Sequence, residues 1–326
     1  MAFLLRRCLH AAFVLMAVSL LVFCAIHLIG NPVELLIDPQ ASADDIARTT
    51  HALGLDQPLW RQYLLFVERA ASGDLGRSFV QGAPVLDLIA ERLPATLELA
   101  SVALLIAVGL GVPLGLRLAV HPGGIFSRGV ALLSMLGFSL PTFWVGLLLI
   151  LLFAVQLGWL PPGGRVAGQT LLGIPVSFLS IEGWKHLLLP AINLALFNTA
   201  LMIRVVRAGA ADALGRDYVR FARARGLAQS RIVGVHVLKN IAIPLVTLMG
   251  LEFGSLIAFA VVTETVFGWP GMGKLLIDSI NALDRPVVVA YLLVTTTLFV
   301  AINLGVDIIY TLLDPRIKLN EDSGHA

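Results

Sequence analysis

The stretch Asp217–Pro244, DYVRFARARGLAQSRIVGVHVLKNIAIP, decides how the rest of this sequence is read. It gathers six basic side chains, counting His236, around a glycine, Gly226. The chain around it has the opposite character, since 58% of its 326 residues are hydrophobic and only 13% are charged. A soluble domain has a charged fraction of about 25%. The composition therefore indicates a membrane protein, in which one basic loop separates two apolar segments.

Six apolar stretches are long enough to cross a bilayer as helices, which takes about 20 residues each. They cover residues 8–29, 95–118, 129–157, 186–206, 241–265 and 287–312. The first exceeds the usual signal-peptide core of about 7–15 residues, so we expect a retained helix. The third is long enough to bend, and Pro141 near its middle removes a backbone hydrogen bond. The pattern predicts an all-α membrane protein with six transmembrane helices.

The loops set the orientation, because cytoplasmic loops carry an excess of Lys and Arg. An inside N-terminus makes Arg6 and Arg7, the turn 119–128 and the loop 207–240 cytoplasmic. The segment 30–94, with nine acidic residues against five arginines, is then outside. We expect both termini in the cytoplasm, and the even number of spans agrees with this.

The outer segment is polar enough to fold in water. Its run QPLWRQYLLFVERAA, residues 57–71, has apolar residues at helical spacing, which predicts a small helical insertion. The expected organisation is an N-terminal transmembrane helix over 1–29, this insertion over 30–94, a five-helix core over 95–312 that includes the loop at about 207–240, and a cytoplasmic tail over 313–326.

The basic loop itself has an amphipathic pattern from Asp212 onward. At about 100° per residue, Arg216, Arg220 and Arg223 share one stripe, and Leu214, Tyr218 and Phe221 lie opposite. Gly226 is then expected to end the helix in a left-handed cap. Attraction to anionic lipid, about 1 kcal/mol per basic residue near the surface, is a simpler reason for the charge. It does not account for the ordered small residues and glycine.

The run YVRFARARGLAQSRIVGVHVLKNIAIPLVT resembles the cytoplasmic EAA loop of binding-protein-dependent ABC importers. Other segments, in chain order, are similar to the dipeptide/oligopeptide/nickel permease family of these importers: GLDQPLWRQY, GDLGRS, RLPATLELA, ETVFGWPGMGKLL and LLDPRI. Two departures lie in the loop, where Phe221 replaces the usual Thr or Glu and Arg225 the usual Lys.

The resemblance implies a type I ABC importer transmembrane fold in a bacterial inner membrane, with an extra N-terminal helix. It implies four kinds of partner: a second homologous permease subunit, two ABC ATPase subunits, a periplasmic or extracellular solute-binding protein, and membrane lipid. No cofactor is expected in this chain, because ATP and magnesium belong to the ATPase subunits. The residues it assigns to ATPase coupling are Tyr218, Phe221, Ala222, Arg223, Ala224 and Gly226.

Polar and helix-breaking residues inside apolar segments are candidates for lining the transport pathway. Glu252 is the central one, and Asn198, Pro141 and Glu264 are further candidates. Hydrogen bonding between helices is an equally physical reason for a buried Glu or Asn, and Glu264 near a segment end can also reach water.

The sequence contains no recognisable catalytic set or metal-binding spacing, so we expect no enzymatic activity. The resemblance implies a transport subunit, and the net charge of +2 gives no reason to expect a nucleic-acid partner. Gly268, Gly273 and Lys274 have the spacing of a phosphate-binding loop, but Leu275 stands where Ser or Thr must hold magnesium. Peptides are the favoured solutes, and glutathione, nickel chelates and opines remain alternatives. An ion-coupled secondary carrier is the remote alternative, since such carriers often show inverted repeats, and none is visible here.

Overall fold

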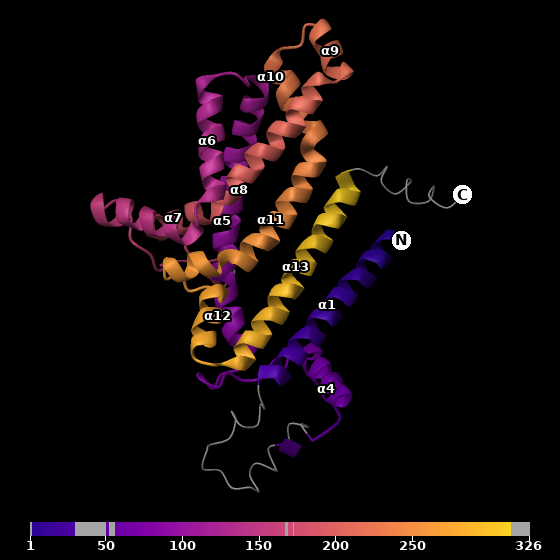
Figure 1. Ribbon diagram of the computed structural model, residues 1–326, viewed down its shortest axis with the longest axis vertical. Coiled ribbons are helices and arrows are strands. Elements are labelled where there is room, and N and C mark those ends of the chain that lie inside the picture. Colours follow the sequence, from indigo (N-terminus) through magenta and orange to yellow (C-terminus); the bar gives the residue numbers. More distant parts are fainter. Residues whose placement is uncertain (1, 30–49, 52–55, 167–168, 172, 314–326) are drawn as a thin grey trace. The chain divides into compact units, whose positions relative to one another are not determined.

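The computed structural model describes residues 2–29, 50–51, 56–166, 169–171 and 173–313, which are mostly helical (Figure 1). Much of the predicted insertion, residues 30–49 and 52–55, lies outside the described residues, as does the tail from 314 to 326. The chain divides into two compact units. One contains residues 1–93 and 275–300, and the other contains residues 94–274 and 301–326.

Five helices are long and apolar enough to cross a membrane, counted over the described part of the chain. They are α1 (Ala2–Ile29), α5 (Val85–Val120), α8 (Ile181–Gly215), α11 (Leu238–Val266) and α13 (Arg285–Leu313). Each contains one of the predicted apolar stretches.

The third predicted stretch is divided. It forms α6 (Ile125–Ser139), then α7 (Thr142–Leu149), which continues as the π-helical segment η1 (Ile150–Gln156). Pro141 takes an extended conformation, with ψ 132°, directly before α7, so the expected bend at this proline is confirmed. Figure 1 shows α6 alongside α5 and α7 turned away from both. Helix α6 has 15 residues, about 22 Å, which is shorter than the roughly 30 Å hydrocarbon core of a bilayer. Helix α7 and η1 together are equally short.

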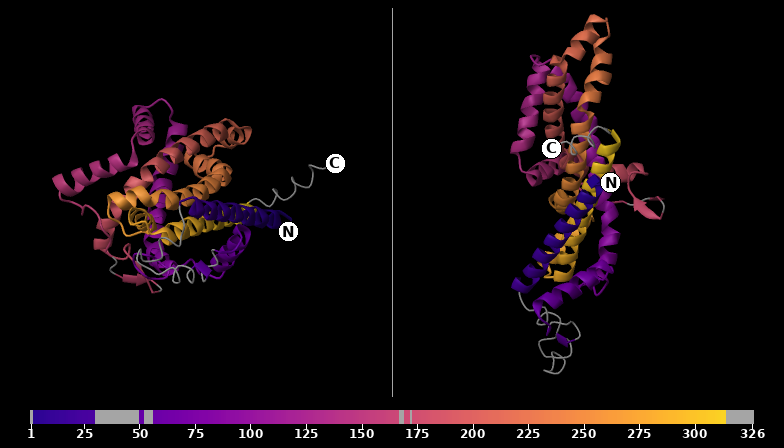
Figure 2. Two further views of the ribbon diagram at one scale, coloured as in Figure 1. Left: turned by 60° about the horizontal axis from the view of Figure 1, so that its bottom comes forward. Right: turned by 90° about the vertical axis from the view of Figure 1, so that its right-hand side faces the viewer.

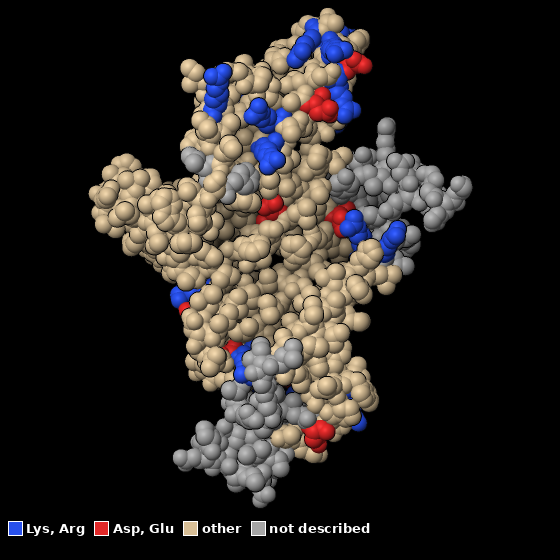
Figure 3. Space-filling model, viewed as in Figure 1, with Lys and Arg blue, Asp and Glu red and all other residues tan. Residues whose placement is uncertain are grey.

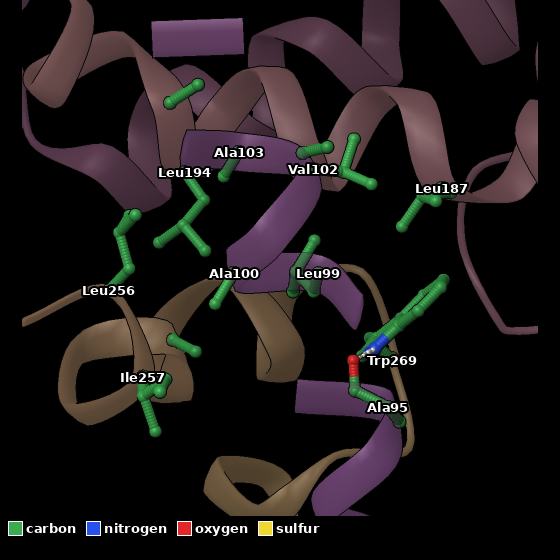
Figure 4. Close-up of a cluster of buried hydrophobic side chains, with 13 residues drawn as sticks. Ala95, Leu99, Ala100, Val102, Ala103, Leu187, Leu194, Leu256, Ile257 and Trp269 are labelled. Carbon is green, nitrogen blue, oxygen red and sulfur yellow. Dashed lines mark hydrogen bonds between the residues drawn. The ribbon is translucent and has the colours of Figure 1, made fainter. Parts of the chain in front are cut away.

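The larger unit is held together by α5, α8 and α11, whose small and branched side chains pack into one apolar core. Figure 4 shows Ala100 of α5 between Leu194 of α8 and Ile257 of α11. Trp269 closes the core, and its indole nitrogen donates to the carbonyl oxygen of Ala95 at 2.9 Å. A buried indole N–H needs such an acceptor.

Two glycines allow α5 and α8 to approach closely. Gly111 and Gly115 are four residues apart, which is the spacing of glycines at close helix contacts in membranes. A Cβ on Gly111 would lie 2.6 Å from the Met202 side chain, and one on Gly115 would lie 2.7 Å from that of Val206. Larger residues at either position would force the two helices apart.

The connection between η1 and α8 contains a short hairpin, β1 (Gln169–Leu171) with β2 (Ile174–Val176), which stands out from the helices in Figure 2. A buried ion pair holds this connection to α5. Arg165 contacts Glu98 at 2.7 Å, and Glu98 also accepts from the backbone N–H of Ser177 at 2.6 Å. Glu98 is therefore satisfied inside the protein rather than in water.

The smaller unit contains α1, α4 (Leu59–Ala71) and parts of α12 (Met272–Asn281) and α13. Helix α4 packs against α1. In the same unit Asp284, which is 2% exposed, accepts from the hydroxyl of Ser78 and, at 3.0 Å, from the backbone N–H of Phe79. This carboxylate ties the loop after α4 to the turn before α13.

Candidate functional site

The basic loop forms an elbow between two membrane-length helices. Helix α8 ends at Gly215, α9 (Asp217–Ala224) follows, and α10 (Gln229–Arg231) leads through the π-helical η2 (Ile232–Val237) into α11. The amphipathic helix was expected from Asp212, but it begins at Asp217. The reason is that Arg216 is extended, with ψ 153°, and interrupts the backbone ladder.

Gly226 turns the chain at the far end of α9. Its φ is +75°, in the left-handed region that favours glycine, so the expected cap is confirmed. The backbone N–H of Gly226 donates to Arg223 at 2.9 Å, and that of Leu227 donates to Ala222 at 3.2 Å. These bonds satisfy carbonyl groups that the helix end would leave free.

One face of α9 is packed inside this chain. Val219 is fully buried and Ala222 is 5% exposed, and both belong to a cluster with Ala213, Ile232 and Val237. Because Ala222 lies in this cluster, it supports the elbow from within. The buried face joins α9 to the end of α8 and to η2.

The other face of α9 is exposed and combines aromatic with basic side chains. Phe221 is 63% exposed and Tyr218 is 38% exposed. The guanidinium of Arg225 lies 5.3 Å from the centre of the Phe221 ring, within the range of a cation–π contact. Arg223 and Ala224 are exposed on the same short helix. Figure 3 shows basic side chains gathered at the end of the larger unit that carries α9 and α10.

A hydrogen bond across the elbow links its two arms directly. The side-chain amide of Asn240, near the start of α11, donates to the Tyr218 hydroxyl at 2.7 Å. The sequence pattern did not point to Asn240, since it lies 22 residues from Tyr218 and outside the helical period of α9. At the other arm, the carboxylate of Asp212 bonds Arg216 at 2.8 Å and raises the pKa of its guanidinium.

Glu264, a candidate for the pathway, is fully buried near the end of α11. Its carboxylate accepts from the Thr96 hydroxyl at 2.6 Å and from the backbone N–H of Lys274 at 3.0 Å. In a phosphate-binding loop such an N–H would face the nucleotide, whereas here Glu264 takes it. Gly273 is also packed directly against Val261, where an added Cβ would lie 2.5 Å from the backbone.

The other three pathway candidates lie apart along the helices. Asn198 of α8 is buried, and its amide oxygen has no hydrogen-bond partner among the described residues. Glu252 of α11 is partly buried and lies 12 residues before Glu264, about 18 Å along a helix. Pro141 lies at the exposed break between α6 and α7.

Within the described part of the chain, no three metal-ligating side chains group together.

Two family models together match most of the chain. "Binding-protein-dependent transport system inner membrane component" matches residues 111–319. "Binding-prot-dependent transport system membrane comp, N-term" matches residues 1–100. The first covers more than half of the chain and contains the whole elbow.

Individual relatives match over nearly their full length. The chain is 42% identical to the di/tripeptide transport system permease protein DppB of Pseudomonas aeruginosa (strain UCBPP-PA14), over 92% of this chain and 94% of the relative. It is 37% identical to the dipeptide transport system permease protein DppB of Escherichia coli (strain K12), over 97% of this chain and 98% of the relative. The glutathione transport system permease protein GsiC of the same strain is 38% identical, over 97% of this chain and 98% of the relative.

A solved structure has the same fold. It is an inward-facing form of the MetNI methionine ABC transporter, with a TM-score of 0.55 and 19% identity. The match covers 71% of this chain and 98% of that one.

Proposed function

The chain belongs to the family of binding-protein-dependent transport system inner membrane components, and from this premise we propose that it is the permease subunit of an ATP-driven importer of di- and oligopeptides. It is a multi-pass inner membrane protein with the all-α fold of type I ABC importers. The substrate class is supported by the 37–42% identity to dipeptide permeases over almost the whole chain.

The exposed elbow carries the proposal, because it gives this chain a surface for a separate ATPase subunit. A short helix with exposed aromatic side chains fits a groove on a partner protein. We assign Phe221, Tyr218, Arg223 and Ala224 to this contact, and the exposure of all four side chains supports the assignment. Ala222 and Gly226 act differently: Ala222 packs the inner face, and Gly226 sets the turn that presents the helix.

The packing of the elbow supports a lever-like mechanism. Its inner face is continuous with the apolar cluster at the ends of α8 and α11, and the Asn240–Tyr218 bond adds a second connection to α11. Movement of α9 on an ATPase surface would thus move both helices. Such small rigid-body shifts of packed elements are a common means of switching between two states.

The remaining subunits complete the proposed importer. A second homologous permease would form the other half of the pathway, two ATPase subunits would bind ATP and magnesium, and a solute-binding protein would deliver the peptide from outside. Glu252, Asn198, Pro141 and Glu264 remain our candidates for the pathway. Among them, Asn198 offers an amide oxygen with no partner in the described chain.

Glutathione is a second candidate substrate, because a glutathione permease is 38% identical over nearly the same length. Nickel chelates and opines stay as further alternatives. The two leading candidates are separated by uptake into vesicles that contain the complex purified with its binding protein. We expect ATP-dependent uptake of a labelled dipeptide, unaffected by excess glutathione. Uptake of glutathione alone would change the substrate assignment.

The elbow contact is tested by purifying the tagged chain from native membranes and identifying the retained proteins by mass spectrometry. We expect the ATPase subunits to be retained by the wild type and lost with Phe221→Asp, since a charge on the exposed ring position opposes docking in an apolar groove. Ile125→Asp is the matched control, because Ile125 is 90% exposed at the start of α6 in the other predicted cytoplasmic turn. Retention by Phe221→Asp would rule out Phe221 as a contact.

A further inference from the structure

Helix α4 has an apolar stripe that is exposed in the described part of the chain. At about 100° per residue, Trp60, Leu64, Val67 and Ala71 lie within about 60° of one another around the helix. The first three are 65%, 56% and 37% exposed. Arg61, Glu68 and Arg69 occupy the adjoining charged side, about 40–140° beyond the edge of the stripe.

A third side of α4 is attached to α1 by an aromatic crossing. Phe23 of α1, which is 7% exposed, has its ring centre 5.4 Å from that of Tyr63 and 5.9 Å from that of Phe66. Two polar pairs flank the crossing. The Tyr63 hydroxyl lies 2.9 Å from that of Ser19, and a ring nitrogen of His27 lies 3.0 Å from the side-chain oxygen of Gln62.

This crossing fixes the depth of α4, since α1 has a defined apolar span. The span covers Arg6–Ala25, and only 11% of its most apolar window is buried in the protein. Phe23 lies two residues inside its end, about 3 Å along the helix axis. The Ser19–Tyr63 pair lies about 9 Å inside the span end, and the His27–Gln62 pair lies just beyond it.

The two polar pairs also match the environments on the two sides of the crossing. In hydrocarbon a hydroxyl needs a protein partner. The Ser19 hydroxyl donates to the carbonyl oxygen of Met16 at 2.8 Å, and the Tyr63 hydroxyl has Ser19 as its partner. The imidazole and amide pair occupies the polar end. Tryptophan and amphipathic helices are typical of this boundary between acyl chains and headgroups.

We propose that α4 is an interfacial helix that lies in the bilayer boundary, with the stripe of Trp60, Leu64 and Val67 against lipid acyl chains. Arg61, Glu68 and Arg69 then face headgroups and water. The inference goes beyond the proposed transport function, and it departs from the expectation that this part of the segment folds in water. The proposed orientation puts α4 at the outer leaflet. The contact of α4 with lipid does not depend on that orientation.

Spin labelling of the complete complex tests the proposal. The two native cysteines, Cys8 and Cys24, are replaced by serine, and single cysteines are introduced as Leu64→Cys or Val67→Cys on the stripe. Glu68→Cys is the matched control on the charged side of the same helix. Each is labelled with a nitroxide and placed, with its co-expressed subunits, in vesicles of phosphatidylcholine and phosphatidylglycerol. Power saturation then compares collisions with oxygen, which is enriched in lipid, and with a water-soluble nickel chelate.

We expect positions 64 and 67 to be relaxed more by oxygen and position 68 more by the nickel chelate. Equal nickel access at all three positions would place α4 in water and overturn the proposal. Exclusion of both reagents at 64 and 67 would also overturn it, because protein would then cover the stripe. Uptake measured in the same vesicles reports on the transport function separately, so failure of one conclusion is distinguishable from failure of the other.

Discussion

At the scale of single residues, Gly226 determines the elbow through its backbone alone. Its φ of +75° costs an L-residue about 1–2 kcal/mol, but an added Cβ would meet no atom within 4 Å. Gly226→Val should therefore reduce peptide uptake several-fold, whereas Gly226→Asn should keep most of it, because asparagine tolerates this conformation. The measurement is the initial rate of labelled dipeptide uptake per amount of permease in the membrane.

Gly215→Val is the control for this prediction. Gly215 ends α8 at the other side of α9, has no positive φ and also has open space around its Cβ position. Its substitution should leave uptake close to that of the wild type. Wild-type uptake by Gly226→Val, or equal loss by both valine variants, would show that the left-handed turn is not what matters.

Residues such as Gly226 and Pro141 could be predicted because each acts on its own backbone. Glu264 could not, since its environment depends on Thr96, 168 residues away in the chain. The same holds for Asn240, whose role follows only once α9 is folded back toward α11. A periodic pattern reports which side of a helix is apolar, but it carries no information on which distant polar group completes a hydrogen bond.

At the scale of elements, the close approach of α5 and α8 depends on the absence of side chains. A Cβ at Gly115 would lie 2.7 Å from the Val206 side chain and 2.9 Å from the carbonyl oxygen of Ile203. We expect Gly115→Leu to destabilise the protein by about 1–3 kcal/mol, the usual cost of overpacking. The check is the melting temperature in detergent together with the amount of chain recovered from membranes.

Gly109→Leu on the same helix is the control, because a Cβ there meets nothing within 4 Å. It adds the same apolar volume on a face open to lipid or to a partner subunit, so its melting temperature should stay near that of the wild type. If Gly115→Leu and Gly109→Leu have the same melting temperature, the tight α5–α8 contact is not what stabilises this unit.

The positions of the long helices were predictable because bilayer thickness sets a minimum apolar length, but α5 and α8 extend well beyond the predicted stretches, to 36 and 35 residues. The bend at Pro141 was also predictable, but the direction of α7 was not, since it depends on how α7 packs against α8 and α11. The attachment of α4 to α1 was not predictable either. Its periodicity predicted a helix, yet the polar pairs with Ser19 and His27 decide where that helix lies.

At the scale of the whole molecule, the orientation in the membrane decides whether the elbow can meet an ATPase subunit in the cytoplasm. In the larger unit, the turn between α5 and α6 and the elbow lie at the same end (Figure 1). These are two of the regions for which the excess of Lys and Arg predicted a cytoplasmic position. Helix α6 begins at this end and α8 returns to it. The turn and the elbow are therefore expected on the same, cytoplasmic side of the membrane.

Cysteine labelling in intact cells tests this orientation. In the background without Cys8 and Cys24, Arg223→Cys on α9 should react with a membrane-impermeant maleimide only after the inner membrane is opened. Ser72→Cys, directly after α4, should react in cells whose inner membrane is intact, since the segment 30–94 is expected outside. Both positions are exposed, so a difference in labelling reports the side of the membrane rather than burial. Labelling of Arg223→Cys from outside would invert the topology, and an ATPase in the cytoplasm could then not reach the elbow.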